Sequence, residues 1–184
     1  MLNRRVGRMC IFDKDDDYAA FLQVLDEAAQ RTPMPLFSYC LMPNHWHLVL
    51  RPRKDGDLSR YMQWLTTTHM RRWHAYRGTR GTGPLYQGRY KSFPVQNDRH
   101  FLTVCRYVER NPLRARLVRR AENWRWSSLA LRLKKKAKID SPPLRFISPG
   151  FPPANLVVDS VPFKDPAALP RTESSPQPHP ATGR

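Results

Sequence analysis

Three features are missing from this sequence, and each absence excludes a class of protein. No apolar run approaches the roughly 20 residues of a membrane span, and the segment "MLNRRVGRMCIF" lacks the pattern of a signal peptide. The three cysteines are far apart and form no C-x-x-C pair, which argues against a disulfide framework or a zinc knuckle. We therefore expect a cytoplasmic protein with no membrane partner, and buried, reduced thiols at Cys10, Cys40 and Cys105.

Acidic residues are also scarce. The chain has 32 Lys and Arg against 15 Asp and Glu, a formal charge of +17 that favours a polyanionic partner, with nucleic acid ahead of an anionic membrane. Between Arg60 and Lys134 there are seventeen basic residues and three acids. Any one arginine can simply lie on a solvated face, but here the basic residues alternate with aromatic residues, a mixture that binds phosphates and stacks on exposed bases. The candidate DNA-binding residues are Arg71, Arg72, Arg89, Lys91, Arg114, Arg116, Arg119, Arg120, Trp73, Tyr86 and Tyr90. For Trp64, Trp124 and Trp126 we expect core packing instead.

The composition changes near residue 138. The 44 residues from Ser141 to Arg184 contain eleven of the eighteen prolines and no Trp, Tyr or Cys, a composition typical of disorder. We expect one domain over residues 1–138, followed by a disordered Pro-rich tail over residues 139–184.

Helix and strand signals alternate within the first 138 residues. Helices are predicted from Asp15 to about Arg31, from Leu58 to about Tyr76, and over "NDRHFLTVCRYVERNP", where Asn-Pro closes the helix. Strands are predicted at about Leu36–Leu41 and His45–Arg51, joined as a tight hairpin, with a further candidate in "LYQGRYKSFPV". This order predicts an α+β fold in which helices cover one face of an antiparallel sheet.

Two histidines lie in the second strand of the hairpin, within "LMPNHWHLVL". Because side chains alternate along a strand, His45 and His47 share one face, and Trp46 lies on the other. Such a pair can coordinate one metal ion if a third ligand comes from another element. Two surface or hydrogen-bonded histidines remain an equal alternative at this point, since the spacing alone is a weak signal.

A second candidate element is the helix that contains "CRYVERNP". Tyr107 and Asn111 are four residues apart and so share a helical face, next to an apolar stripe that includes Cys105 and Val108. A phenol and an amide could approach the same ion. The alternative is a tyrosine anchored at the edge of the core and an asparagine that ends the helix.

Four blocks, in the order "YCLMPNHWHLVL", "GPLYQGRYKSFPV", "CRYVERNPLRARLV" and "WRWSSL", resemble the single-tyrosine HUH transposases, most closely their REP-associated branch. The resemblance implies a ferredoxin-like domain in which His45, His47 and Asn111 bind Mg²⁺ or Mn²⁺ and Tyr107 is the nucleophile. It also implies a substrate of single-stranded DNA carrying a short hairpin, cleaved through a 5′-phosphotyrosine bond. Family members carry a further stretch before the segment that matches "LNRRVGRMCIF", so we expect an incomplete first strand that weakens support for the histidine strand.

Two other functions remain open from the sequence. The first is a noncatalytic nucleic-acid-binding protein that keeps the basic surface without the chemistry, as in a decayed transposase. The second is a nicking endonuclease for plasmid or phage replication, which shares the site but has a different layout around its tyrosine. We expect a monomer or homodimer associated with the nucleoid.

Overall fold

The structure of the protein, a computed structural model, describes residues 1–4, 9–95, 98–136 and 156–157. In chain order its elements are β1 (Leu2–Arg4), α1 (Asp15–Arg31), β2 (Leu36–Met42), β3 (His45–Leu50), α2 (Asp57–Arg77), β4 (Pro94–Val95), α3 (Asp98–Arg114), the 3-10 helix η2 (Ala121–Asn123), α4 (Ser128–Lys136) and β5 (Leu156–Val157). The Pro-rich tail predicted over residues 139–184 lies outside the described residues apart from the two residues of β5.

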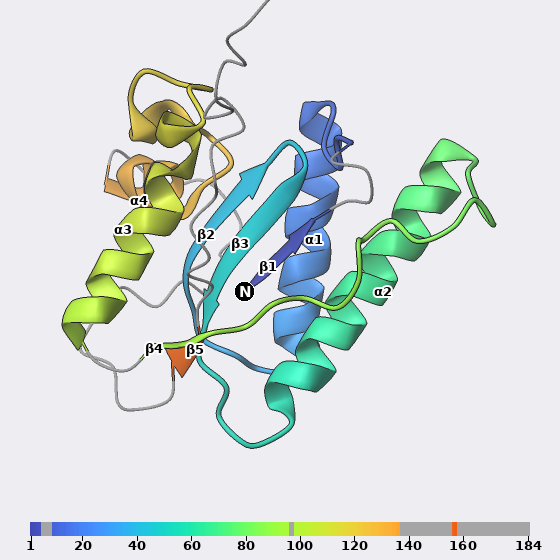
Figure 1. The fold of residues 1–184 in the computed structure, drawn as a ribbon, viewed down its shortest axis with the longest axis horizontal. Helices are drawn as coiled ribbons and strands as arrows, with labels where there is room; N and C mark the ends of the chain where they lie inside the picture. The colour runs from blue at the N-terminus through green and yellow to red at the C-terminus, as the bar shows by residue number, and fades with distance from the viewer. Residues whose placement is uncertain (5–8, 96–97, 137–155, 158–184) are drawn as a thin grey trace, which may run out of the picture.

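Strand β3 is the centre of an antiparallel sheet (Figure 1). It pairs with β2 along one side and with β1 and then β5 along the other, while β4 pairs with β5. His47 lies between Leu2 and Cys40, and His45 lies between Arg4 and Met42. The predicted α+β class and antiparallel sheet are confirmed. Although β1 has only three residues, both histidines have a paired strand on each side, so the expected loss of support does not occur at these positions.

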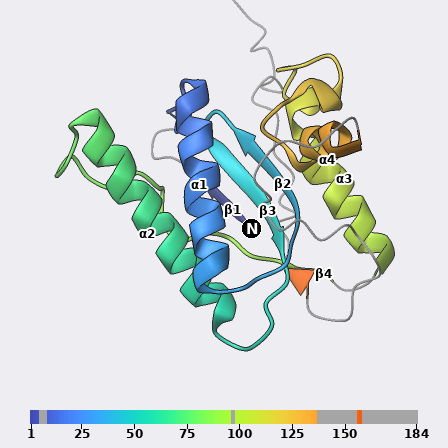
Figure 2. The same ribbon diagram turned by 180° about the vertical axis from the view of Figure 1, so that it is seen from behind.

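Helices cover both faces of this sheet (Figures 1 and 2). Trp46 and Leu48 of β3 belong to one buried cluster with residues of α1 and α2, whereas Val49 belongs to a second cluster with Val104 and Val108 of α3. The prediction that helices cover one face therefore needs a correction. Every residue of β2 and β3 is buried, so a layer on each face must shield the alternating side chains from water.

Helix α3 continues past the point where Asn111-Pro112 was predicted to end it. Proline lacks the N–H that would bond to the carbonyl oxygen of Val108. The side-chain Nδ2 of Asn111 donates to the carbonyl oxygens of Tyr107 at 3.0 Å and Val108 at 3.4 Å, and so partly replaces the missing donor. The helix ends after Arg114, and Arg116 adopts a left-handed conformation with φ 55°.

The remaining expectations are met in part. Of the strand predicted in "LYQGRYKSFPV", only Pro94–Val95 forms a strand, and Lys91 makes an isolated bridge to Leu2. A buried thiol is confirmed for Cys40 and wrong for Cys10, which is exposed, while Cys105 is half-buried. Across the described ranges, no helix is both long and apolar enough to cross a membrane.

Behind the histidine pair, a buried hydrogen-bonded chain connects β3 to α2. The Tyr86 hydroxyl accepts a hydrogen bond from Trp46 Nε1 at 3.3 Å and lies 2.5 Å from His69 Nδ1. Burial raises the pKa of Tyr86, so its phenol stays protonated and donates to Nδ1. Burial also lowers the pKa of His69 from 6.5 to about 3, so the imidazole stays neutral in the folded protein. These hydrogen bonds fix Trp46, the residue between the two histidines, on the opposite face of the sheet.

The depressed pKa of His69 predicts a specific pH dependence of stability. In the unfolded chain this imidazole gains a proton below about pH 6.5, whereas in the folded protein it stays neutral down to about pH 3. Its contribution to the free energy of unfolding is therefore complete above about pH 6.5 and is lost as the pH falls, by up to about 1.4 kcal/mol per pH unit. In urea unfolding between about pH 7 and 4, His69→Gln should show a shallower loss than wild type. Parallel profiles would contradict this assignment.

Candidate active site

Two imidazoles meet on the face of β3 that α3 covers. His45 and His47 are 8% and 6% exposed, and their ring centroids lie 5.0 Å apart with the ring planes near perpendicular, at 82°. His45 Nδ1 lies 2.6 Å from Oδ1 of Asn44. Because that oxygen only accepts hydrogen bonds, Nδ1 carries the proton and Nε2 carries the lone pair that a metal would use.

Tyr107 lies on α3 directly across from this pair. Its ring centroid is 6.3 Å from that of His47, and the two ring planes stand at 88°. The guanidinium carbon of Arg114, two helical turns later, lies 5.0 Å from the Tyr107 ring centroid. The phenol ring is therefore held between an imidazole and a cation, both from the same chain.

Asn111 follows Tyr107 by one turn and is 8% exposed. Its Nδ2 is directed to its own helix, so Oδ1 is the end of the amide that would serve as a ligand. Among the described residues there is no group of three or more His, Cys, Asp or Glu that could hold a metal, which leaves this amide as the candidate third ligand beside the two histidines. The donor set of two imidazoles and an amide suits a divalent ion beside DNA, because neutral ligands leave its full charge for a phosphate.

The segment that carries these four residues matches a known protein family. The model of the family described as IS200-like transposases matches residues 4–111, a range that contains both histidines, Tyr107 and Asn111. The chain belongs to this family. A solved structure of a REP-associated tyrosine transposase bound to a REP hairpin has the same fold, with a TM-score of 0.61 and 14% identity over 80% of this chain and 86% of that one. A search of curated proteins found no match.

The basic residues predicted to bind DNA lie on both sides of the sheet. Arg71 and Arg72 lie on α2, on the far side of the sheet from α3, and Arg72 makes two hydrogen bonds of 2.8 Å to Glu27. Arg120 is likewise paired with Glu122. On the catalytic side, the exposed Arg114, Arg116 and Arg119 lie at or beyond the end of α3. Arg89 is exposed, and Lys91, two residues later, forms an isolated β-bridge with Leu2. Leu2 is in turn the strand partner of His47.

The predicted base-stacking role is wrong for two of the aromatic residues. Trp73 and Tyr86 are 8% and 7% exposed, and Trp73 Nε1 donates to the carbonyl oxygen of Ile11 at 2.9 Å. Their rings face the core, where no base can reach them. Tyr90 is half-buried against the same cluster. The core packing predicted for the other tryptophans is confirmed, because Trp64, Trp124 and Trp126 all pack in or against this cluster.

Glu109, for which the sequence alone suggests no role, anchors α3. Its Oε1 accepts hydrogen bonds from the hydroxyls of Ser38 on β2 and Ser128 on α4, and from the guanidinium of Arg132 on α4. Glu109 is 7% exposed. An acid in the middle of a mostly basic helix, together with the serines of "WRWSSL", was the available signal. The partners of Glu109 could not be assigned from it, because they come from elements distant in sequence.

Removing this anchor should loosen the helix that carries Tyr107. Glu109→Ala removes the carboxylate that pairs with Arg132 and accepts from two buried hydroxyls, so we expect a loss of roughly 3 kcal/mol in the free energy of unfolding, measured with urea. Glu122→Ala removes an exposed ion pair with Arg120 and is the matched control, with a much smaller expected loss. Equal losses in the two variants would show that the buried network does not anchor α3.

Proposed function

We propose that this transposase cuts and rejoins single-stranded DNA next to a hairpin through a covalent bond between Tyr107 and the 5′ side of the cut. The observation that carries the proposal is the contact of Tyr107 with His47, at 6.3 Å between ring centroids. Asn111 lies one helical turn from Tyr107 on α3. Family membership supports strand transfer, and the hairpin held by the similar solved structure supports the substrate class.

In this proposal His45, His47 and Asn111 would hold Mg²⁺ or Mn²⁺, which would supply Lewis-acid chemistry for the scissile phosphate. The Tyr107 phenol oxygen attacks phosphorus, which forms the phosphotyrosine bond and breaks the bond from phosphorus to the 3′ oxygen. The phenol proton passes to water, and the departing 3′ oxygen takes a proton from water. Attack by another 3′-hydroxyl reverses these steps and rejoins DNA, since the phosphodiester energy is retained in the phosphotyrosine.

Arg114 positions both reactants. Its guanidinium lies over the phenol ring, which restricts the ring to one orientation, and it keeps donors for the oxygens of a phosphate beside that ring. A lysine offers a point charge and no flat surface, so it replaces the arginine only in part.

Covalent capture tests the proposed chemistry. We expect the purified protein, incubated with Mn²⁺ and labelled single-stranded hairpins from the flanks of its own gene, to give a protein–DNA adduct on a denaturing gel. Tyr107→Phe should abolish the adduct by removing the nucleophilic oxygen, and His47→Ala should abolish it by removing a metal ligand. Tyr76→Phe, at a tyrosine of α2 that is 66% exposed, is the control that keeps activity.

Two results would count against the proposal. An adduct that survives Tyr107→Phe would refute the choice of nucleophile. Tight hairpin binding by the wild-type chain without any adduct would favour the noncatalytic binding protein.

The role of Arg114 has its own test. At saturating DNA, Arg114→Ala should slow adduct formation by about tenfold or more, because a donor aimed at the reacting phosphate is lost. Arg114→Lys should recover part of the rate. Arg106→Ala, at an exposed arginine of the same helix, is the matched control and should react at the wild-type rate. Equal rates for Arg114→Ala and Arg106→Ala would show that Arg114 adds only positive charge and does not position the reactants.

A further inference from the structure

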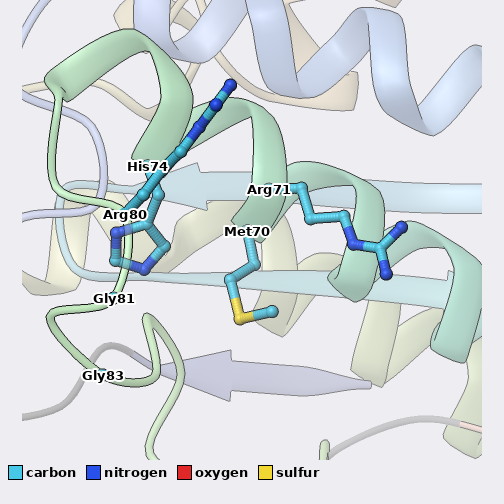
Figure 3. A pocket seen from close by; sticks show the side chains of 6 residues that line it. All are labelled: Met70, Arg71, His74, Arg80, Gly81 and Gly83. Atoms are coloured by element: carbon cyan, nitrogen blue, oxygen red, sulfur yellow. The ribbon is translucent and has the colours of Figure 1, made fainter.

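Exposed cations outside the proposed site lie on both sides of the sheet. Arg71 and Arg80 line a hollow between the end of α2 and the loop that follows it (Figure 3). Helix α2 packs on the side of the sheet opposite α3, so this hollow does not face Tyr107. Lys91 lies at the edge of β1, and the pairing of the strands determines where its side chain points.

A row of paired residues runs across the sheet from Lys91 to His47. The amide of Leu2 donates to the carbonyl oxygen of Lys91 at 3.2 Å, and the amide of Lys91 donates to that of Leu2 at 3.0 Å. Leu2 is in turn the partner of His47 in β3. Residues directly opposite one another in antiparallel strands point their side chains to the same face. Lys91, Leu2 and His47 therefore share the face of the sheet that carries the proposed metal site.

The residues next to Lys91 and Leu2 support this direction. Tyr90 packs against the buried cluster on the α2 side of the sheet, and Met1 belongs to that cluster together with Leu48. Successive side chains of an extended chain alternate between the two faces of a sheet. Lys91 follows Tyr90 and Leu2 follows Met1, so both point to the α3 side.

Lys91 lies on a part of this face that is open to solvent. Among the described residues, the buried cluster beneath α3 contains members of β2, β3 and β4 and none of β1. Leu2 is half-buried and Lys91 is exposed. No carboxylate in the described ranges forms an ion pair with Lys91. Its ammonium is thus a charge that the protein does not neutralise, on the side of the site away from α3.

The distance across the sheet decides which phosphate Lys91 can reach. Neighbouring strands lie about 4.8 Å apart, so Lys91 stands about 10 Å from His47. In the proposed mechanism the scissile phosphate lies beside His47 and Tyr107, which leaves a neighbouring phosphate of the same strand for Lys91. A lysine suits this contact, because a compact charge with rotatable donors on a flexible stem adapts to the varied geometry of a single strand.

We propose that Lys91 holds the backbone phosphate next to the scissile one, on the side of the site opposite Arg114, and so positions the strand for attack by Tyr107. This inference rests on the proposed function and adds a contact that the proposed chemistry does not use. With Arg114 on α3 and Lys91 at the edge of β1, the strand is held from both sides of the site.

Uncharged phosphates test the contact. Labelled hairpins are made in which one phosphate of the single-stranded flank at a time is replaced by a methylphosphonate, and their dissociation constants with the full chain are measured by fluorescence anisotropy without added metal. We expect one position to weaken wild-type binding by about tenfold, since a charge-assisted contact is lost. Lys91→Met keeps the backbone bridge to Leu2. It should weaken binding of unmodified DNA by a similar factor and abolish the effect of that position.

Lys91→Arg and Lys134→Met are the matched controls. Arginine keeps the charge at the same place, and Lys134 is an exposed lysine of α4, so both variants should retain the position effect. A flat profile in the wild type would overturn the proposal. The same position effect in Lys91→Met as in the wild type would also overturn it, because Lys91 would then add only general positive charge.

Adduct formation separates positioning from affinity. At saturating DNA with Mn²⁺, Lys91→Met should form the Tyr107 adduct about tenfold more slowly than Lys134→Met, because a misplaced phosphate lies off the line of attack. Equal rates for these two variants would overturn the positioning role.

The two assays also separate this inference from the proposed function. An adduct in the wild type without the position effect removes the role of Lys91 alone. A position effect that depends on Lys91, without any adduct, retains the phosphate contact and removes the cleavage chemistry.

Discussion

Packing of α3 across the histidine-bearing face of the sheet is the contact on which the site depends. Val104 and Val108 of the helix join Phe37 and Val49 of the strands in one buried cluster. Tyr107 is adjacent to Val108, so burial of the apolar stripe places the phenol beside His47. The same packing buries Glu109 against β2 and α4, where its hydrogen bonds fix the helix in position. A hydrophobic contact and a polar anchor thus set the geometry of the reacting groups.

The opposite face of the sheet contributes rigidity. Alternation along β3 directs Trp46 to the face of the sheet opposite α3. On that face its indole bonds to Tyr86, and Tyr86 bonds to His69. A strand fixed on both faces and paired along both edges has little freedom to move its imidazoles. Such preorganisation lowers the cost of binding an ion and a phosphate together.

Local rules are sufficient to group the residues of the proposed site. The two-residue period of a strand places His45 and His47 on one face, and the i, i+4 spacing places Tyr107 and Asn111 together on a helix. Trp73 and Tyr86 are buried in the core. The sequence does not distinguish them from aromatic residues that are free to stack on bases, because basic residues are close to both kinds in the sequence. The Glu109 anchor, the second helical layer and the continuation of α3 through Pro112 depend on contacts between distant segments or on one side-chain hydrogen bond.

In the proposed mechanism, one chain supplies both the nucleophile and the ligands of a single site. A complementation experiment tests it most directly: Tyr107→Phe and His47→Ala proteins are mixed with labelled hairpin DNA and Mn²⁺, and adducts are separated on a denaturing gel. Because Tyr107 contacts His47 of its own chain, the mixture should be as inactive as each variant alone. An adduct in the mixture would mean that α3 of one molecule completes the site of another, and would refute a site built within one chain.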